Sequence, residues 1–369
     1  MRATQDHPSR PRREPPLRRH VPDHRERARA HLRPRQQAAR HARHLPRRRL
    51  DLPLDPPEGA HLQPDGKRRP GGGPARGAAG VIVAVTGASG SLGRHLCSYL
   101  PRRGWEMRAL VRDPDAFRLL RPGIHAGRCD LPEVLDESVL DGADAVVHCA
   151  YPTRLADLEQ IRRVNEEGTR RMLEASRRAG VRRFVFISSV TAHPHAPSYY
   201  ARSKHALEAL FDPQRDVVIR PGLILAREGQ GLFQQMREGM RRTHVLPLFG
   251  GGQQPLQTVH VDDVCEAVAR ALERNLTGAF NVAEPDPISF ATFLRMMARR
   301  LGIRCLFLPL PFTPVLAGVR AVEALRLPFP LRSESLLGIK ALRRVPVADD
   351  LRRLDLRVRS AGESLADLL

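Results

Sequence analysis

The chain is poor in the features that mark several classes of protein. Aromatic residues make up only 5% of its 369 residues, with a single tryptophan. The five cysteines are widely spaced and form no C-x-x-C pair; they are Cys97, Cys129, Cys149, Cys265 and Cys305. An odd and scattered set argues against a disulfide framework or a zinc site. We therefore expect reduced, buried thiols and no metal centre.

Long apolar runs are also missing. No uninterrupted apolar stretch approaches the roughly 18 residues that a membrane-spanning helix needs. The longest candidate, Cys305 to Val319, is interrupted by Pro309, Pro311 and Pro314. These absences predict a soluble, cytoplasmic protein without a membrane partner.

Acidic residues are scarce in the first part of the chain. Residues 1–80 contain 20 Lys plus Arg against 8 Asp plus Glu, which is +12 of the formal net charge of +21. The stretch has no aromatic residue and no periodicity, so it cannot bury enough apolar surface to fold. We predict a disordered Arg/Pro/His-rich tail. Three alternatives are an electrostatic anchor for nucleic acid or anionic membrane, a targeting segment, and a translation start near Val81. Charge so localised does not indicate a specific nucleic-acid surface.

After this tail the sequence shows regular strand and helix patterns. The segment Val81 to Leu96, VIVAVTGASGSLGRHL, runs from an apolar strand into glycines at three-residue spacing and then into a helical pattern. Gly87 permits a tight turn, Gly90 lets backbone N–H groups approach a pyrophosphate, and Gly93 permits close packing of helix and strand. The segment predicts a dinucleotide phosphate site.

Strand and helix patterns then alternate. We expect strands at 81–85, 105–111, up to 131, 145–150, 184–188 and 216–219, with helices at 91–100, 113–120, before the fourth strand, at 155–179 and 200–211. Six parallel strands in this rhythm predict an α/β, Rossmann-like doubly wound sheet. We assign residues 81–225 to this domain. Residues 226–369, with helices near 261–274, 289–301 and 316–325, would form a smaller, mostly helical substrate-binding region.

The carboxyl ends of the strands carry the residues that suggest chemistry, as expected for this fold. Tyr200 and Lys204 stand four residues apart on one helix face, 11 residues after a strand that ends in Ser188-Ser189. Together with the G-x-x-G-x-x-G loop led by Thr86, this order resembles the short-chain dehydrogenase superfamily. RPGL at 220–223 and HVDDV at 260–264 resemble its extended branch, the NAD-dependent epimerase/dehydratases, over about Val81 to Ala283.

The resemblance implies catalytic roles for Ser189, Tyr200 and Lys204. A tyrosine with a pKa near 10 is a poor base at neutral pH, and lowering that value by about 3 units takes roughly 4 kcal/mol. One cation about 4 Å away, at an effective dielectric of about 20, supplies about that much. We therefore expect Lys204, assisted by the positive charge of the oxidised nicotinamide, to lower the pKa of Tyr200 and also to hold the nicotinamide ribose hydroxyls. Ser189 would hydrogen-bond the substrate oxygen.

The resemblance also implies a cofactor site. It comprises Gly87, Ala88, Ser89, Gly90, Ser91, Leu92, Gly93, Arg112, Asp130, Leu131, Ala150, Tyr200, Lys204, Pro221 and Leu223. Arg112, where NAD-binding relatives place an acidic residue, favours the 2′-phosphate of NADP over NAD. The alternative for Arg112 is a solvated arginine at a strand end, and the adjacent Asp113 could weaken its preference for the phosphate. Asp130 is expected to hydrogen-bond the adenine amine, and its alternative is a helix N-cap.

The expected reaction is hydride transfer between nicotinamide and a carbinol or carbonyl carbon of a small molecule, such as a sugar nucleotide. Pro255, Leu256 and Gln257 replace the arginine that typical sugar-nucleotide epimerases carry before the H-V-x-D element. Alternatives are therefore a simple NADPH-dependent ketone or aldehyde reductase and a non-catalytic NADP-binding sensor or assembly factor. Family likeness suggests a homodimer. His260, Asp262 and Asp263 are expected to be structural, with the two aspartates capping a helix.

Overall fold

The computed structural model describes residues 80–152, 158–229, 231–327 and 331–369, all of which fall in one compact unit, residues 75–369. The tail predicted for residues 1–80 lies outside the described residues, except for Gly80. The start of the helix expected at 155–179 lies outside them as well.

An eight-stranded sheet organises the described chain, in the order β12-β7-β6-β5-β1-β2-β3-β4. Its strands are β1 (Ile82–Thr86), β2 (Glu106–Val111), β3 (His125–Asp130), β4 (Val134–Leu135), β5 (Ala145–His148), β6 (Arg183–Ile187), β7 (Val217–Pro221) and β12 (Gly278–Val282). All pairs are parallel except β3 with β4. Strand order grows outward from β1 in both directions, which confirms the doubly wound fold.

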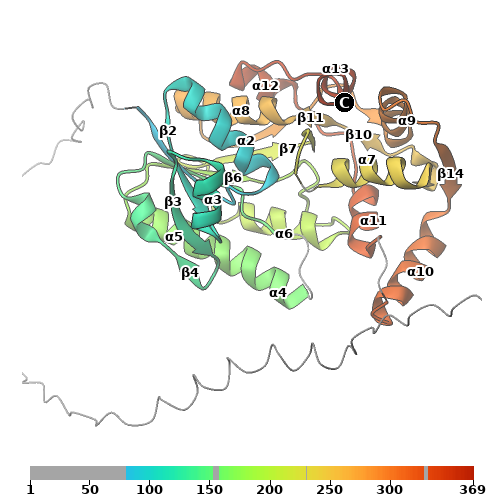
Figure 1. Ribbon diagram of the computed structural model, residues 1–369, viewed down its shortest axis with the longest axis horizontal. Helices are drawn as coiled ribbons and strands as arrows, with labels where there is room; N and C mark the ends of the chain where they lie inside the picture. The colour runs from blue at the N-terminus through green and yellow to red at the C-terminus, as the bar shows by residue number, and fades with distance from the viewer. Residues whose placement is uncertain (1–79, 153–157, 230, 328–330) are drawn as a thin grey trace, which may run out of the picture. The chain divides into compact units, whose positions relative to one another are not determined.

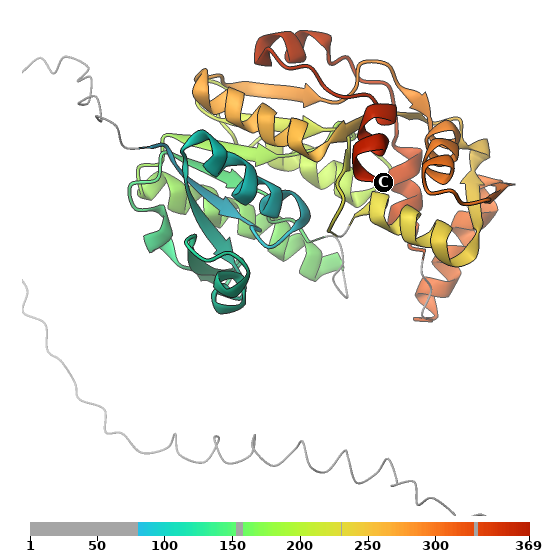
Figure 2. The same ribbon diagram turned by 45° about the horizontal axis from the view of Figure 1, so that its top comes forward.

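Helices cover both faces of the sheet (Figures 1 and 2). On one face, α2 (Ser91–Tyr99), α8 (Val261–Glu273) and α12 (Ala348–Leu354) share an apolar core with β1, through side chains such as Leu96, Val264 and Leu351. On the other face, α5 (Gly168–Arg178) and α6 (Tyr199–Glu208) pack through Met172 and Leu207 onto β5 and β6. Because both faces are covered, β1 at the centre of the sheet is a nearly continuous apolar run rather than an alternating one.

Several local expectations differ from the structure. In place of a helix before β5, the chain forms β4 and a 3-10 turn, Glu137–Leu140. The long helix expected at 155–179 is divided into α4 (Leu158–Arg162), a π-helical turn (Arg163–Glu167) and α5. The seventh parallel strand, β12, was not expected and lies after residue 225, so the sheet draws one strand from the part assigned to the C-terminal region.

The C-terminal part has an apolar core of its own, built around Phe233, Phe290, Phe293 and Leu336. Its helices include α7 (Leu232–Thr243), α9 (Phe290–Arg300), α10 (Phe312–Ala324), α11 (Ser333–Lys340) and α13 (Ala361–Leu368). Three two-stranded sheets join them: β8 (Leu223–Leu225) with β11 (Thr258–His260), β9 (Val245–Phe249) with β14 (Leu306–Leu310), and β10 (Pro255–Leu256) with β13 (Ile288–Ser289). Within the described ranges, no helix has the length and apolarity needed to cross a membrane.

Candidate active site

The glycine loop has the shape of a phosphate cradle. Gly87 has φ +63°, and a Cβ there would lie 2.9 Å from the backbone nitrogen of Ala150. A Cβ on Gly93 would lie 2.2 Å from the carbonyl oxygen of Gly87. The loop ends at the N-terminus of α2, whose N-cap, Gly90, provides no side-chain hydrogen bond to the first turn. Backbone N–H groups at such a helix end bind anions, so the cradle fits a dinucleotide pyrophosphate.

The predicted cofactor residues follow the edge of the sheet beyond β1. Arg112 comes directly after β2 and is exposed. Asp113, which was expected to blunt its charge preference, is the N-cap of α3 (Pro114–Leu120) and accepts a hydrogen bond from the Ala116 N–H at 3.0 Å. Asp130 ends β3 and pairs with Val134, so it is a strand residue and does not cap a helix.

On the other side of β1, the carboxyl ends of β5, β6 and β7 bring together residues that are far apart in the sequence. Ala150 follows β5, Ser189 follows β6, and Pro221 ends β7, which are neighbouring parallel strands. Their carboxyl ends therefore meet at the same edge, next to the glycine loop after β1. Leu223 begins β8 just beyond.

Tyr200 and Lys204 occupy the first two turns of α6, which begins after the N-cap Ser198. The Lys204 side chain is almost fully buried, and its Nζ donates a hydrogen bond to the Ile187 carbonyl at 2.6 Å. The same Nζ lies 3.8 Å from the ring centroid of Tyr151. Tyr151 in turn meets the Tyr200 ring edge to face, with centroids 5.4 Å apart. Lysine and tyrosine are thus held in one packed group at the end of β6.

The pKa of Tyr200 is raised, whereas Lys204 was expected to lower it. The protein's own residues, Lys204 included, do not produce the expected shift. Burial raises the pKa of Tyr200 above its ordinary value, and a side-chain hydrogen bond with Ser189 lowers it. Burial also lowers the pKa of Lys204 to about 7. Desolvation is the largest cause of both shifts, because burial penalises the charged form of each group. Tyr200 is therefore held as a protonated hydroxyl, suited to giving a proton.

The third residue of the group, Ser189, lies at the end of β6 and is 9% exposed. Its Oγ lies 2.8 Å from Oγ1 of Thr191 and also accepts a hydrogen bond from the Thr191 backbone N–H at 3.2 Å. These contacts fix the hydroxyl of Ser189. Sequence reasoning missed the part played by Thr191.

A half-buried ion pair next to Lys204 on α6 was also missed. Glu208 stands four residues after Lys204 on α6 and accepts hydrogen bonds from Arg220, Nε to Oε1 at 2.9 Å and Nη2 to Oε2 at 2.5 Å. The Ser188 hydroxyl donates to the same carboxylate. The spacing of Glu208 from Lys204 was the available signal, but only the fold brings Arg220 of β7 to it.

A second missed acidic residue comes from the C-terminal region. Glu334, in the first turn of α11, accepts a hydrogen bond from the Tyr199 backbone N–H at 2.9 Å. It therefore binds the N-terminus of α6 beside Tyr200, where a negative charge is favourable. Nothing in the sequence near Ser189 indicated this residue.

Gln257 is one of the three residues that stand where sugar-nucleotide epimerases carry an arginine, and its side chain is hydrogen-bonded to the backbone. Its side chain is 3% exposed, and its amide donates to the carbonyls of Glu284 and Val345 at 3.0 and 3.1 Å. It also accepts from the Val345 N–H at 2.8 Å. A fully paired, buried amide does not serve a ligand.

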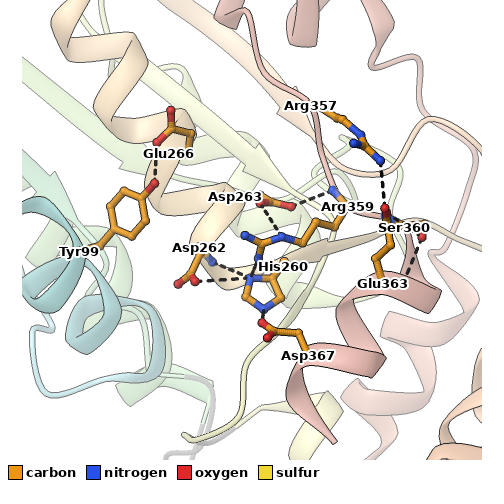
Figure 3. Close-up of polar contacts among 10 residues, drawn as sticks. All are labelled: Tyr99, His260, Asp262, Asp263, Glu266, Arg357, Arg359, Ser360, Glu363 and Asp367. Atoms are coloured by element: carbon orange, nitrogen blue, oxygen red, sulfur yellow. Dashed lines mark hydrogen bonds and ion pairs between the residues drawn. The ribbon is translucent and has the colours of Figure 1, made fainter. Parts of the chain in front are cut away.

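Residues around His260 hold the end of the chain in place, as Figure 3 shows. We call His260, Asp263, Arg359 and Asp367 the C-terminal clamp. His260 Nδ1 accepts from the Asp262 N–H at 3.1 Å and meets the Arg359 guanidinium, while Nε2 lies 3.0 Å from Asp367. The Arg359 N–H donates to Asp263 at 2.9 Å. His260 is structural, as expected, but it is the side chain that caps α8, in place of the two aspartates.

The fold and the glycine cradle are those of a dinucleotide-binding α/β protein, and Ser189, Tyr200 and Lys204 gather at the same edge of its sheet as the candidate reaction centre. The family model described as "NAD dependent epimerase/dehydratase family" matches residues 83–283, and the chain belongs to that family. Membership supports an oxidoreductase-type enzyme.

Among curated proteins, the chain is similar to a ceramide reductase of Caulobacter vibrioides, with 33% identity over 254 residues that cover 66% of this chain and 78% of the relative. It is also similar to a Stigmatella aurantiaca protein named 4-hydroxy-2-methyl-3-oxo-4-farnesyl-3,4-dihydroquinoline-1-oxide ketoreductase. That relative is 30% identical over 268 residues, covering 65% of this chain and 79% of its own.

Solved structures share the fold. The human epimerase family protein SDR39U1 with NADPH has a TM-score of 0.58 at 21% identity and covers 78% of this chain and 99% of its own. MoeE5 in complex with UDP-glucose and NAD has a TM-score of 0.59 at 22% identity, covering 77% and 96%. Structural neighbours thus include complexes with either dinucleotide.

Proposed function

We propose that the protein is an NADPH-dependent carbonyl reductase that converts a ketone or aldehyde to an alcohol. The observation that carries the proposal is the position of Tyr200, which is hydrogen-bonded to Ser189 and stands one helical turn before the buried Lys204. A reduction needs a proton donor at the carbonyl oxygen, whereas an oxidation needs a base there. With a pKa above its ordinary value, Tyr200 carries its proton at neutral pH, as the first task requires.

The surrounding side chains complete this arrangement. Ser189, fixed by Thr191, would donate a hydrogen bond to the carbonyl oxygen and stabilise the negative charge that develops there. Tyr200 would then deliver its proton to that oxygen. When bound, the dinucleotide supplies the hydride that reduces the carbonyl carbon. Lys204, buried one turn from Tyr200, would hold the cofactor's ribose hydroxyls through its ammonium group.

The preference for NADPH rests on Arg112. The guanidinium is exposed at the end of β2, where a 2′-phosphate would lie in this fold. Asp113 already accepts a hydrogen bond from α3, so its carboxylate is engaged away from that phosphate. We expect Arg112→Ala to weaken NADPH binding about tenfold and NADH binding little. Arg102→Ala, at an exposed arginine of the 3-10 turn after α2, is the matched control.

A simple carbonyl substrate is favoured over a sugar nucleotide. Pro255, Leu256 and Gln257 stand where sugar-nucleotide epimerases carry the diphosphate-binding arginine, and the one polar side chain among them, Gln257, is fully hydrogen-bonded to the backbone. The two curated relatives carry names of reductases, one of ceramide and one a ketoreductase. Both observations support a single hydride transfer that consumes the cofactor. Epimerisation, the second candidate, would return the hydride and consume none.

The test is net oxidation of NADPH with a panel of ketones and aldehydes, including apolar ones. Tyr200→Phe should lower turnover by about 100- to 10,000-fold, because it removes the proton donor. Tyr199→Phe is the matched control, since the Tyr199 hydroxyl points to Glu166 at 2.9 Å. Equal turnover by Tyr200→Phe and the parent would contradict the proposal. NADPH binding without turnover of any substrate would favour the sensor, and an epimer formed without NADPH loss would favour the epimerase.

A further inference from the structure

One end of the molecule exposes aliphatic side chains on two paired strands. β9 and β14 run in parallel, with Val245 opposite Leu306. Leu306 is 58% exposed, Leu308 is 40% exposed and Val245 is 36% exposed. The two strands form a sheet of their own, so β14 has a partner on one side only among the described strands. Adjacent exposed aliphatics mark an interaction surface, whereas single ones do not.

Arginines surround these aliphatics. Arg241 and Arg242 end α7 just before β9, while Arg299 and Arg300 end α9, and Arg304 stands two residues before β14. Figures 1 and 2 show α7, α9 and β14 gathered at the same end of the molecule. We call these five arginines, with Val245, Leu306 and Leu308, the basic-apolar end.

Few negative charges oppose these arginines. Arg242 pairs with Glu238 at 2.5 Å, and in the part of the chain that the structure describes the other four form no ion pair. The sequence from Pro287 to Val322 contains five arginines and no Asp or Glu. The basic-apolar end is therefore a strongly positive surface with an apolar centre.

We propose that the basic-apolar end docks onto an anionic phospholipid surface. The guanidinium groups match phosphate oxygens in charge and in bidentate geometry. The aliphatic side chains of β14 would enter the boundary between headgroups and acyl chains, as apolar side chains of interfacial proteins do. Charge complementarity and apolar contact then act at the same place.

A second copy of this chain fits the same surface poorly. A two-fold interface would place the five arginines of one copy against those of the other. Only one of the five has an acidic partner of its own, so the facing charges would repel. An anionic bilayer supplies the opposite charge instead.

This inference differs from the sequence-based expectation of no membrane partner. That expectation rested on the length of apolar runs, which concerns spanning helices alone. The basic-apolar end is assembled from α7, β9, α9 and β14, and no continuous run of the sequence contains it. It is independent of the proposed reductase activity.

The test measures co-sedimentation of the full chain with vesicles of phosphatidylcholine alone and of phosphatidylcholine with phosphatidylglycerol. Binding to the anionic vesicles only is expected. The variant R299S/R300S/R304S should bind them about 100-fold more weakly. Because residues 1–80 carry a net +12 (20 basic against 8 acidic residues), the matched control is R47S/R48S/R49S, which removes the same charge from that segment. Equal losses in both variants would overturn the proposal.

The aliphatic part is tested separately. L306S/L308S should weaken binding about tenfold, whereas L119S/L120S should leave it unchanged. The control pair is apt because Leu119 and Leu120 are 87% and 76% exposed on α3, away from β14 in the chain. Parent-like binding by L306S/L308S would count against the proposal. A parent dimer that this variant converts to a monomer, seen by light scattering, would assign the surface to self-association instead.

A third variant guards against misfolding of the double substitution. Leu306→Trp adds an indole at an exposed position, and brominated acyl chains in anionic vesicles should quench its fluorescence. The only other tryptophan, Trp105, is 9% exposed and provides the background. Absence of added quenching would overturn the proposal even where the other variants fail to fold.

Discussion

The reaction centre and the C-terminal clamp are both clusters of polar side chains, the first around the buried Lys204 and the second around the buried His260 and Asp263, and their charges have different partners. In the clamp, each charge meets another: Arg359 contacts His260 and Asp263, and Asp367 lies 3.0 Å from His260 Nε2 (Figure 3). At the reaction centre, the Lys204 ammonium is buried against a carbonyl and two aromatic rings, and it forms no ion pair with a carboxylate among the residues that the structure describes.

This difference distinguishes charges that can bind a ligand from charges that hold the fold together. A charge that is paired inside the protein stabilises the fold, because removing one partner leaves the other buried and unpaired. A charge that burial destabilises costs folding free energy and is available to a substrate or cofactor. Substitutions at the two clusters should therefore act on different quantities, turnover at one and stability at the other.

The largest effect should come from Lys204→Met. Turnover is expected to fall about 1,000-fold, because the buried cation is lost from the reaction centre. The midpoint of thermal unfolding should not fall, since an apolar side chain of similar length replaces a desolvated charge. Kinetics and thermal melts on the same preparation check both parts. A large drop in the midpoint would mean that Lys204 is chiefly structural.

Glu208→Gln should affect both stability and turnover, because this carboxylate is paired with Arg220 and also stands one helical turn after Lys204. It leaves the Arg220 guanidinium without its bidentate partner, and we expect the free energy of unfolding to fall by about 3 kcal/mol. Turnover should fall less than in Lys204→Met, since no reacting group is removed. Chemical denaturation is the measurement, with the exposed Glu174→Gln as control. Wild-type stability would show that the ion pair is energetically neutral.

Asp263→Asn tests the clamp alone. The substitution removes the charge that holds the Arg359 backbone and guanidinium, which should lower the free energy of unfolding by about 2 kcal/mol. The neighbouring Asp262→Asn is the matched control, because its more exposed carboxylate lies 3.9 Å from His260 and contacts no arginine of the clamp. kcat should stay within about twofold of the parent in both. A selective loss of turnover in Asp263→Asn would show that the clamp also contributes to the reaction, and would contradict the distinction between the two clusters.

The smallest effect concerns pH. Burial and the Arg359 charge lower the pKa of His260 below its usual value, although Asp262, Asp263 and Asp367 act in the opposite direction. The unfolded chain therefore binds this proton more readily, so stability present above about pH 6.5 is lost as the pH falls. His260→Gln should make the curve of stability against pH shallower. His148, buried with a pKa lowered to about 3, has the same sign and persists in both proteins. Parallel curves for parent and variant would contradict the prediction.

Much of the sheet could be predicted because each strand and its helix carry a local pattern. Val81 to Val85 are apolar because β1 is covered on both faces, and Gly87 and Gly93 are required where any Cβ would meet backbone atoms. The weaker success after residue 225 also has a physical cause. β9 pairs with β14, and β12 pairs with β7, so the partner of each strand is remote in the chain and no local pattern announces the pairing.

The sequence by itself determined the alternation of strands and helices up to residue 225, the glycine cradle and the helix that carries Tyr200 and Lys204, since these follow from patterns local in the chain. Only the tertiary structure decided how those groups are charged. Burial, which raises the pKa of Tyr200 and lowers that of Lys204, depends on every element packed around them. It likewise decided the partners of Glu208 and His260, because ion pairs form across distances in space that sequence spacing does not encode.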